Sequence, residues 1–241
     1  MAGRLYGVGL GPGDPELVTV KAARLIGACP VVAYFAKAGR RGHARTIADR
    51  YIPAHAEELP LYYPMTTELP FDHPEYLETL SRFYAVSCAA LAANLEAGRD
   101  VALIAEGDPL FYGSFMHLFM RLKDRFACEI VPGVTGMAGC SAAAGAPMTW
   151  GDDILTVLPG TLPFAALVER LKASDAAVVM KLGSNFTKVR AAFEEAGLLD
   201  RALYVERGTM AGEAVVALKD KRQGPAPYFS LVLLPGQGRR P

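Results

Sequence analysis

The sequence has no charge of one sign in excess, and this absence excludes one broad class of function. Its 241 residues carry 25 basic and 25 acidic side chains, so the formal net charge is zero. A dedicated nucleic-acid-binding protein carries a basic excess, which this chain lacks. The hydrophobic fraction of 51% is also too high for a disordered chain. We therefore expect a folded protein that is not a dedicated nucleic-acid binder, and a local basic patch for an anionic small molecule stays open.

Long apolar runs are also absent. The longest uncharged stretch, residues 130–151, is interrupted by Pro132, Pro147 and five glycines. Most of its other residues are small, so it is too weakly apolar to span a bilayer. Residues 1–10 contain no apolar core of the kind found in signal peptides. We expect no membrane contact and a cytoplasmic protein.

Cysteine and histidine are scarce, with four of each. The cysteines are separated by 59, 40 and 12 residues, which matches no zinc or redox motif. The histidines show no ligand spacing either. We therefore predict buried, unpaired cysteines and no metal held by the protein.

Short apolar runs alternate with helical patterns, which is typical of an α/β fold with parallel strands. We predict two α/β domains, residues 1–132 and 133–241, the first with a mainly parallel sheet and the second with a mixed sheet. The expected strands are residues 5–10, 31–35, 58–62, 101–105, 128–131, 154–158, 176–182, 202–206, 213–218 and 228–234. The expected helices are residues 19–28, 74–97, 113–123, 134–144, 164–173 and 186–196.

The helix at 74–97 has the clearest pattern. Pro74 suits its first turn and Gly98 suits the position after its end. One apolar face is expected to be buried, formed at spacings of three and four by Leu77, Leu80, Tyr84, Cys88, Leu91 and Leu95. Thr19 is expected to cap the helix that follows it. Only the tail, residues 237–241, is expected to be disordered.

A glycine-rich segment, residues 7–15, follows the first strand. Its glycines indicate a sharp turn or the close approach of a ligand. The dinucleotide pattern G-x-G-x-x-G fails here because Pro12 and Asp14 stand where its third glycine would be. A purely structural turn is the competing interpretation.

The segment 105–113 follows the buried strand 101–105. Ligands of open α/β sheets bind beyond the carboxyl ends of strands, where Glu106 and Asp108 stand. These carboxylates suit a ribose, a cation or an amine, or Asp108 merely caps the next helix. Three further segments lie at helix entrances or strand ends: residues 131–137, 179–183 and 204–210.

Together these five segments resemble the tetrapyrrole methylase family. The family pattern G-x-G-P-G-D matches Gly9 to Asp14, and G-D-P-x-x-Y matches Gly107 to Tyr112. The P-G-x-T entrance matches Pro132 to Thr135, the strand-end methionine matches Met180, and E-R-G-T matches Glu206 to Thr209. Each motif is weak alone, but five in order over about 200 residues are specific.

Three features resemble the branch of precorrin-2 C(20)-methyltransferases. They are Glu106 before Gly-Asp-Pro, the Phe-Tyr-Gly-Ser run at 111–114 and the segment 63–68. One departure is Gly136, where the family carries Ser or Ala, so a hydroxyl role is lost there.

The resemblance implies a methyltransferase of cobalamin biosynthesis that uses S-adenosyl-L-methionine, releases S-adenosyl-L-homocysteine and converts precorrin-2 to precorrin-3A. It also implies a homodimer with the active site in a cleft between the two domains. The cofactor residues would be Pro12, Gly107, Asp108, Thr135, Gly136, Met180 and Gly208. Glu106 and Tyr112 would lie near the reacting carbon, which must lose a proton after methylation.

A basic cluster at Lys37, Arg40, Arg41, His43 and Arg45 could meet the substrate's carboxylates. Arg40, Arg41 and Arg45 are the predicted substrate-binding residues, and a solvated loop is the competing interpretation. Two other functions remain open: a sibling methylase that acts on another ring position or on the cobalt-containing substrate, and a non-catalytic nucleotide-binding regulator.

Overall fold

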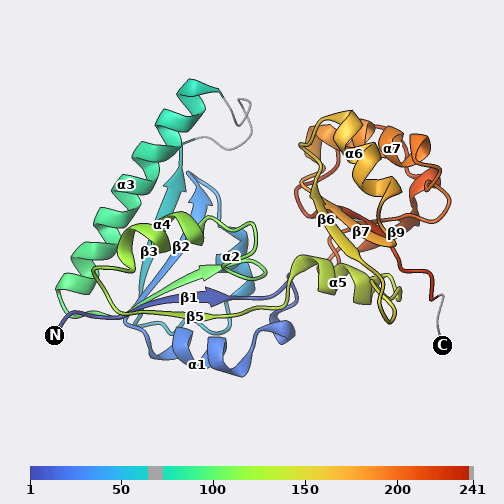
Figure 1. Ribbon diagram of the computed structural model, residues 1–241. Coiled ribbons are helices and arrows are strands. Elements are labelled where there is room, and N and C mark those ends of the chain that lie inside the picture. The colour runs from blue at the N-terminus through green and yellow to red at the C-terminus, as the bar shows by residue number, and fades with distance from the viewer. Residues whose placement is uncertain (65–72, 239–241) are drawn as a thin grey trace. The chain divides into compact units, whose positions relative to one another are not determined.

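The computed structural model describes residues 1–64 and 73–238, and it divides into two compact units, Met1–Thr135 and Gly136–Pro241 (Figure 1). The sequence places the division after Pro132, three residues earlier. Residues 133–135 belong to the first unit because the Gly133 amide donates to the Asp108 carboxylate at 3.1 Å. Each unit is an α/β domain, as predicted.

The first unit contains a parallel sheet of five strands in the order β3-β2-β4-β1-β5. Its strands are β1 (Leu5–Gly9), β2 (Val31–Lys37), β3 (Glu57–Tyr63), β4 (Val101–Ala105) and β5 (Cys128–Val131). The helices are α1 (Val20–Ala28), α2 (His43–Ile47), α3 (Pro74–Glu96) and α4 (Phe115–Leu122), with a 3-10 turn η1 at Pro15–Leu17.

Alternating side chains of the strands bury two separate cores, one on each face of this sheet. Leu103 and its neighbours pack against Phe83 of α3 and Phe115 of α4. Ile104 packs on the other face with Ile26 of α1 and Ile47 of α2. Helices on both faces bury the strands on both sides, which explains their near-continuous apolar sequences.

The second unit contains a mixed sheet of five strands in the order β6-β7-β10-β8-β9 among the described residues. Its strands are β6 (Leu155–Pro159), β7 (Ala176–Met180), β8 (Leu203–Glu206), β9 (Ala214–Ala217) and β10 (Ser230–Leu234). Its helices are α5 (Gly136–Ala143), α6 (Phe164–Lys172) and α7 (Phe186–Glu195), with 3-10 turns η2 (Gly183–Asn185) and η3 (Leu218–Asp220).

Strands β6 and β7 are parallel, while β10 is antiparallel to both β7 and β8. The mixed character predicted from the missing C-terminal helices is therefore confirmed. Helices α6 and α7 cover one face, with Phe186 and Phe193 fully buried. Helix α5 covers the other face through Cys140 and Met137.

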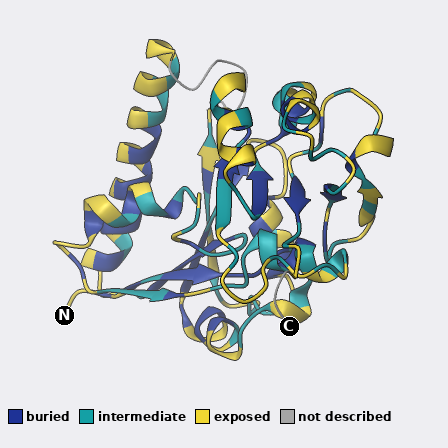
Figure 2. Ribbon diagram, turned by 45° about the vertical axis from the view of Figure 1, so that its right-hand side comes forward, coloured by how far each residue is buried: buried dark blue, intermediate teal, exposed yellow. Residues whose placement is uncertain are grey.

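The structure corrects three expectations. Leu77 is 55% exposed because the first turns of α3 run past the strands, as Figures 1 and 2 show. Helix α2 forms where a loop was expected. The tail continues in place through Gly238, which lies against the Trp150 ring, while residues 239–241 lie outside the described ranges.

No helix in the described ranges has the length and apolar character needed to cross a bilayer. The four cysteines are free, as predicted, but only three are buried, because Cys128 on the outermost strand β5 is partly exposed. Among the described residues, no group of three or more His, Cys, Asp or Glu side chains could hold a metal ion.

The predicted cap of α1 gives a direct test of the local folding signals. The Thr19 hydroxyl accepts from the Ala22 amide at 3.1 Å. We predict that Thr19→Ala lowers the free energy of unfolding by about 1 kcal/mol, whereas Thr19→Ser retains most of it. Urea denaturation followed by circular dichroism checks this, and equal losses in both variants would contradict the cap.

Candidate functional site

The carboxyl ends of β1 and β4 form a topological switch point in the first unit. After β1 the chain enters α1 on one face of the sheet, and after β4 it enters α4 on the other face. The two strands are neighbours, so the loops that follow them diverge from a shared edge. Ligands of open α/β sheets bind at such a point.

Backbone hydrogen bonds join the two diverging loops. The Gly11 amide donates to the Gly107 carbonyl at 3.2 Å, and the Gly107 amide donates to the Gly11 carbonyl at 2.7 Å. Pro12 follows this bridge and is buried. The structure therefore brings together two of the predicted segments, residues 7–15 and 105–113.

The third segment, after β5, meets the same point. A Cβ on Gly133 would lie 2.0 Å from the Gly107 carbonyl oxygen, and one on Gly9 would lie 2.6 Å from the Gly133 nitrogen. Real side chains do not tolerate such distances, so glycine is required at both positions. Three loops that are distant in sequence thus touch through bare backbone.

Asp108 lies at the centre of this junction. One carboxylate oxygen accepts from the Leu110 amide at 2.9 Å, and the other accepts from the Gly133 amide at 3.1 Å. The first contact closes a local turn and does not cap α4, whose N-cap is Ser114, and the second ties the loop after β4 to the loop after β5. A carboxylate has about four acceptor sites, so Asp108 keeps capacity for a ligand's hydroxyl or ammonium groups.

Glu106 and Tyr112 flank this loop. Glu106 is half-buried and its carboxylate accepts from the Ala44 amide of α2 at 2.9 Å. Tyr112 is 43% exposed, stands beside Phe111 and has a positive φ of 54°. That conformation is uncommon for a bulky side chain and is found mainly at functional or strained positions.

The second unit gathers its own predicted residues around α5. Met180 ends β7 and packs with Met137 of α5. Gly208 follows β8, and a Cβ there would lie 2.8 Å from the Cys140 sulfur. Around Gly136 there is open space, with nothing within 4 Å of an added Cβ.

Strained backbone marks the same strand ends in the second unit. Strands β7 and β8 run in the same direction, because both are antiparallel to β10. Lys181 follows β7 with φ 57°, and Arg207 and Thr209 follow β8 with φ 50° and 69°. Such residues cost energy in these conformations, which supports a functional origin for the two segments.

The arginines predicted to bind substrate differ in their surroundings. Arg45 is held by Glu58, with Nε at 2.5 Å and Nη2 at 2.7 Å from its two oxygens, and by Asp49 at 2.8 Å. Arg41 also pairs with Asp49. Arg40 is exposed and makes no ion pair with any residue that the structure describes. The geometry therefore gives Arg45 a structural role and leaves Arg40 accessible.

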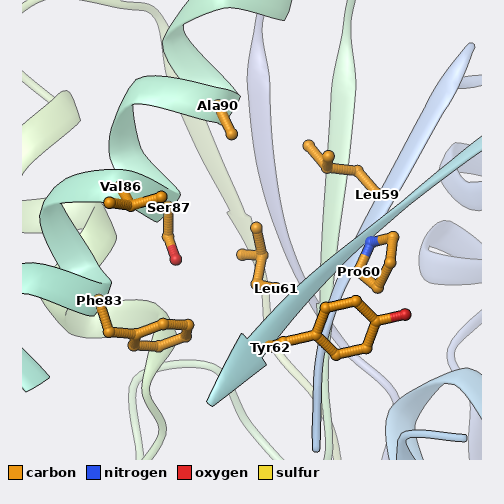
Figure 3. A pocket seen from close by; sticks show the side chains of 8 residues that line it. All are labelled: Leu59, Pro60, Leu61, Tyr62, Phe83, Val86, Ser87 and Ala90. Carbon is orange, nitrogen blue, oxygen red and sulfur yellow. The ribbon is translucent and has the colours of Figure 1, made fainter. Parts of the chain in front are cut away.

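An apolar groove of about 260 Å³ lies elsewhere in this unit, between β3 and α3 (Figure 3). Its walls include Leu59, Leu61, Phe83 and Val86, and the hydroxyl of Tyr62 points away from the side chains of α3. None of the predicted site residues lines it. None of the residues that line this groove is charged, so it lacks groups that would bind the carboxylates of a polyanionic ligand.

Two of the three features that carry the branch resemblance, residues 63–68 and 111–114, are joined by a hydrogen bond between their described residues. The Tyr63 hydroxyl donates to the Ser114 hydroxyl, which joins the end of β3 to the start of α4. Residues 65–68 of the predicted segment 63–68 lie outside the described residues.

The sequence matches a known family along most of its length. Residues 4–221 match the tetrapyrrole (corrin/porphyrin) methylases. The chain belongs to the tetrapyrrole methylase family. This confirms the resemblance inferred from the five motifs.

Relatives in this family share nearly the full length of the chain. A precorrin-2 C(20)-methyltransferase from a Sinorhizobium species is 54% identical over 239 residues, covering 99% of this chain and 98% of the relative. A cobalt-precorrin-2 C(20)-methyltransferase from Salmonella typhimurium is 33% identical, with 97% of each chain covered.

A solved structure of the family has the same fold. It is a uroporphyrin-III C-methyl transferase from Thermus thermophilus complexed with S-adenyl homocysteine, at 25% identity and a TM-score of 0.66. The alignment covers 97% of this chain and 92% of that structure.

The Arg45–Glu58 pair predicts a pH dependence of stability. The hydrogen bond from Arg45 lowers the pKa of the Glu58 carboxyl below its ordinary value. The stabilisation is therefore complete above the unfolded pKa of about 4.3 and is lost as pH falls through the lower folded value.

We expect Glu58→Gln to lose less stability than the wild type between about pH 4 and pH 2, because its amide does not titrate. Urea midpoints over this range check the difference. Glu78→Gln, which removes an exposed carboxylate paired with Arg82 on α3, is the matched control. Parallel acid profiles for Glu58→Gln and the wild type would contradict the role of this pair.

Proposed function

We propose that this protein is an S-adenosyl-L-methionine-dependent methyltransferase that methylates precorrin-2 at C(20) to give precorrin-3A. The observation that carries the proposal is the 54% identity, over 99% of the chain, to a relative named for that reaction. The switch-point edge of the first unit is consistent with it, because its glycine backbone and acidic side chain suit a nucleoside with hydroxyl and ammonium groups.

The donor set in the described residues fits this cofactor. Asp108 retains acceptor capacity for ribose hydroxyls or the ammonium group, and Gly107 has no side chain to block an approach. We assign cofactor binding to Pro12, Gly107 and Asp108 in the first unit. We extend the same assignment to Thr135, Gly136, Met180 and Gly208.

Bound S-adenosyl-L-methionine supplies an electrophilic methyl group on a sulfonium. The protein's task is then alignment, because holding the acceptor carbon in line with this methyl can contribute roughly 7–11 kcal/mol. Side chains that form covalent intermediates are not needed. The close backbone contacts of Gly9, Gly107 and Gly133 suit such a task, because they pack three loops against one another without intervening side chains.

Proton removal from the methylated carbon is the second step. We keep the prediction that Glu106 and Tyr112 lie near this carbon, because both border the loop that holds Asp108, and we assign the proton transfer to the Tyr112 phenol. The phenol of Tyr112 lies on a half-exposed side chain.

We assign the binding of substrate carboxylates to Arg40 and Arg41. Arg45, also predicted to bind substrate, is engaged by Glu58 and Asp49 and holds this part of the chain in place. We further propose a homodimer in the cytoplasm, as the family resemblance implies. An active site in a cleft between the two domains also stays a prediction.

Incubating the purified protein with precorrin-2 and S-adenosyl-L-methionine tests the reaction. Mass spectrometry and NMR of the product should show one added methyl group at C(20). A parallel incubation with the cobalt-loaded substrate separates the two activities named in the relatives. Methylation elsewhere, or cofactor binding without turnover on either substrate, would contradict the proposal and favour a sibling methylase or a nucleotide-binding regulator.

Asp108→Asn tests the cofactor assignment. Losing a charged hydrogen bond costs about 1.5–3 kcal/mol, so S-adenosyl-L-methionine affinity should fall roughly ten- to hundred-fold. The rate at saturating cofactor should largely recover. Calorimetry and steady-state kinetics measure the two quantities.

The matched control is Asp100→Asn. The Asp100 carboxylate also accepts from a backbone amide, that of Arg4, but at the amino ends of β4 and β1. Unchanged affinity in Asp108→Asn with a collapsed saturated rate would make Asp108 catalytic instead.

A further inference from the structure

One contact of the site is not explained by cofactor binding. The Glu106 carboxylate, directly after β4, accepts from the backbone amide of Ala44 in α2 at 2.9 Å. The two residues are 62 positions apart in sequence. A carboxylate at the ligand-binding edge is thus used to fix a separate helix of the same unit.

Helix α2 depends on such a contact. It has five residues, far fewer than an isolated helix needs to be stable in water. Its N-cap is Gly42, which has no side chain to satisfy the first amides of the helix. Glu106 supplies the missing acceptor from another strand, in the way that an N-cap side chain does.

Glycine at position 42 is itself required by close packing. A Cβ there would lie 2.4 Å from the Phe35 carbonyl oxygen of β2. The chain therefore cannot carry a local Ser, Thr or Asp cap at this position without moving off the sheet. This constraint explains why the cap comes from Glu106.

The segment that α2 anchors contains the accessible basic side chains. Arg40 and Arg41 lie just before α2, and Ala44 and Ile47 bury its apolar face against the sheet. Arg45, the third residue of α2, pairs with Glu58 of β3 and with Asp49. Residues 38–42 therefore connect the end of β2 at Lys37 to a helix that both contacts hold.

We propose that Glu106 is a positioning residue, which fixes α2 so that Arg40 and Arg41 meet the carboxylates of the tetrapyrrole. This inference rests on the proposed function for its substrate. A glutamine side chain at position 106 can perform the same role, because the backbone N–H of Ala44 requires only an acceptor oxygen. A general base at the same position would require a group that takes up a proton.

The test compares Glu106→Gln, which keeps an acceptor oxygen, with Glu106→Ala, which removes it. In Glu106→Ala the KM for precorrin-2 should rise roughly 5-fold to 30-fold, the range that follows from losing a cap contact of one to two kcal/mol. The kcat at saturating substrate should change little. Glu106→Gln should restore KM towards the wild-type value, with an unchanged pH profile of kcat.

Hydrogen exchange at the Ala44 amide gives a readout that needs no substrate. Exchange at residues 43–46 should quicken in Glu106→Ala and remain slow in Glu106→Gln. The matched control is Asp100→Ala, which deletes a carboxylate contact to the Arg4 amide at the opposite edge of the sheet. It should leave both this exchange and KM unchanged.

Two results would overturn the inference. A collapse of kcat in Glu106→Gln, with slow exchange retained at Ala44, would identify Glu106 as the proton acceptor. Unchanged exchange and KM in Glu106→Ala would show that α2 needs no anchor. If exchange quickens as expected but precorrin-2 is not a substrate, the anchor stands and the proposed function fails.

Discussion

The loop after β4 connects the segments that lie at the carboxyl ends of the strands in the first unit. Three successive residues of this loop each hold a different segment: Glu106 holds α2, Gly107 holds the loop after β1, and Asp108 holds the loop after β5. The connections are possible because β4, β1 and β5 are neighbours with their carboxyl ends together. A displacement of this loop would therefore disturb α2 and the loops after β1 and β5.

This arrangement explains why so few side chains in the family motifs carry chemistry of their own. Gly9 and Gly133 are required because backbone atoms of neighbouring loops occupy the space of a side chain. Methyl transfer from a sulfonium needs alignment more than acid, base or nucleophile. The close-packed glycines with one carboxylate suit the alignment that we propose, and relatives named as methyltransferases are consistent with that proposal.

Much of the fold follows from the sequence for simple physical reasons. Strands such as 101–105 are apolar on both faces because helices cover both sides of the sheet. Such a continuous apolar run can be recognised in the sequence. Thr19 and Gly98 mark helix ends with residues whose role is local. The motif segments at strand ends were also recognisable, because parallel topology brings carboxyl ends to one edge.

The features that sequence could not supply depend on distant partners. Helix α2 has five residues and owes its cap to Glu106, so no local signal predicts it. In sequence, Arg40 and Arg45 belong to one basic cluster. Only the structure shows that Arg45 pairs with Glu58 and Asp49 while Arg40 is exposed. Leu77 fits the apolar face of α3 in sequence, yet its turn extends beyond the sheet.

The central claim is that the junction of the β1, β4 and β5 loops binds the cofactor. Backbone amide NMR during titration with S-adenosyl-L-homocysteine tests it most directly. The account predicts that the largest shifts in the first unit occur at Gly11, Gly107 and Gly133. Shifts confined to the groove residues between β3 and α3, such as Leu61 and Ser87, would contradict it.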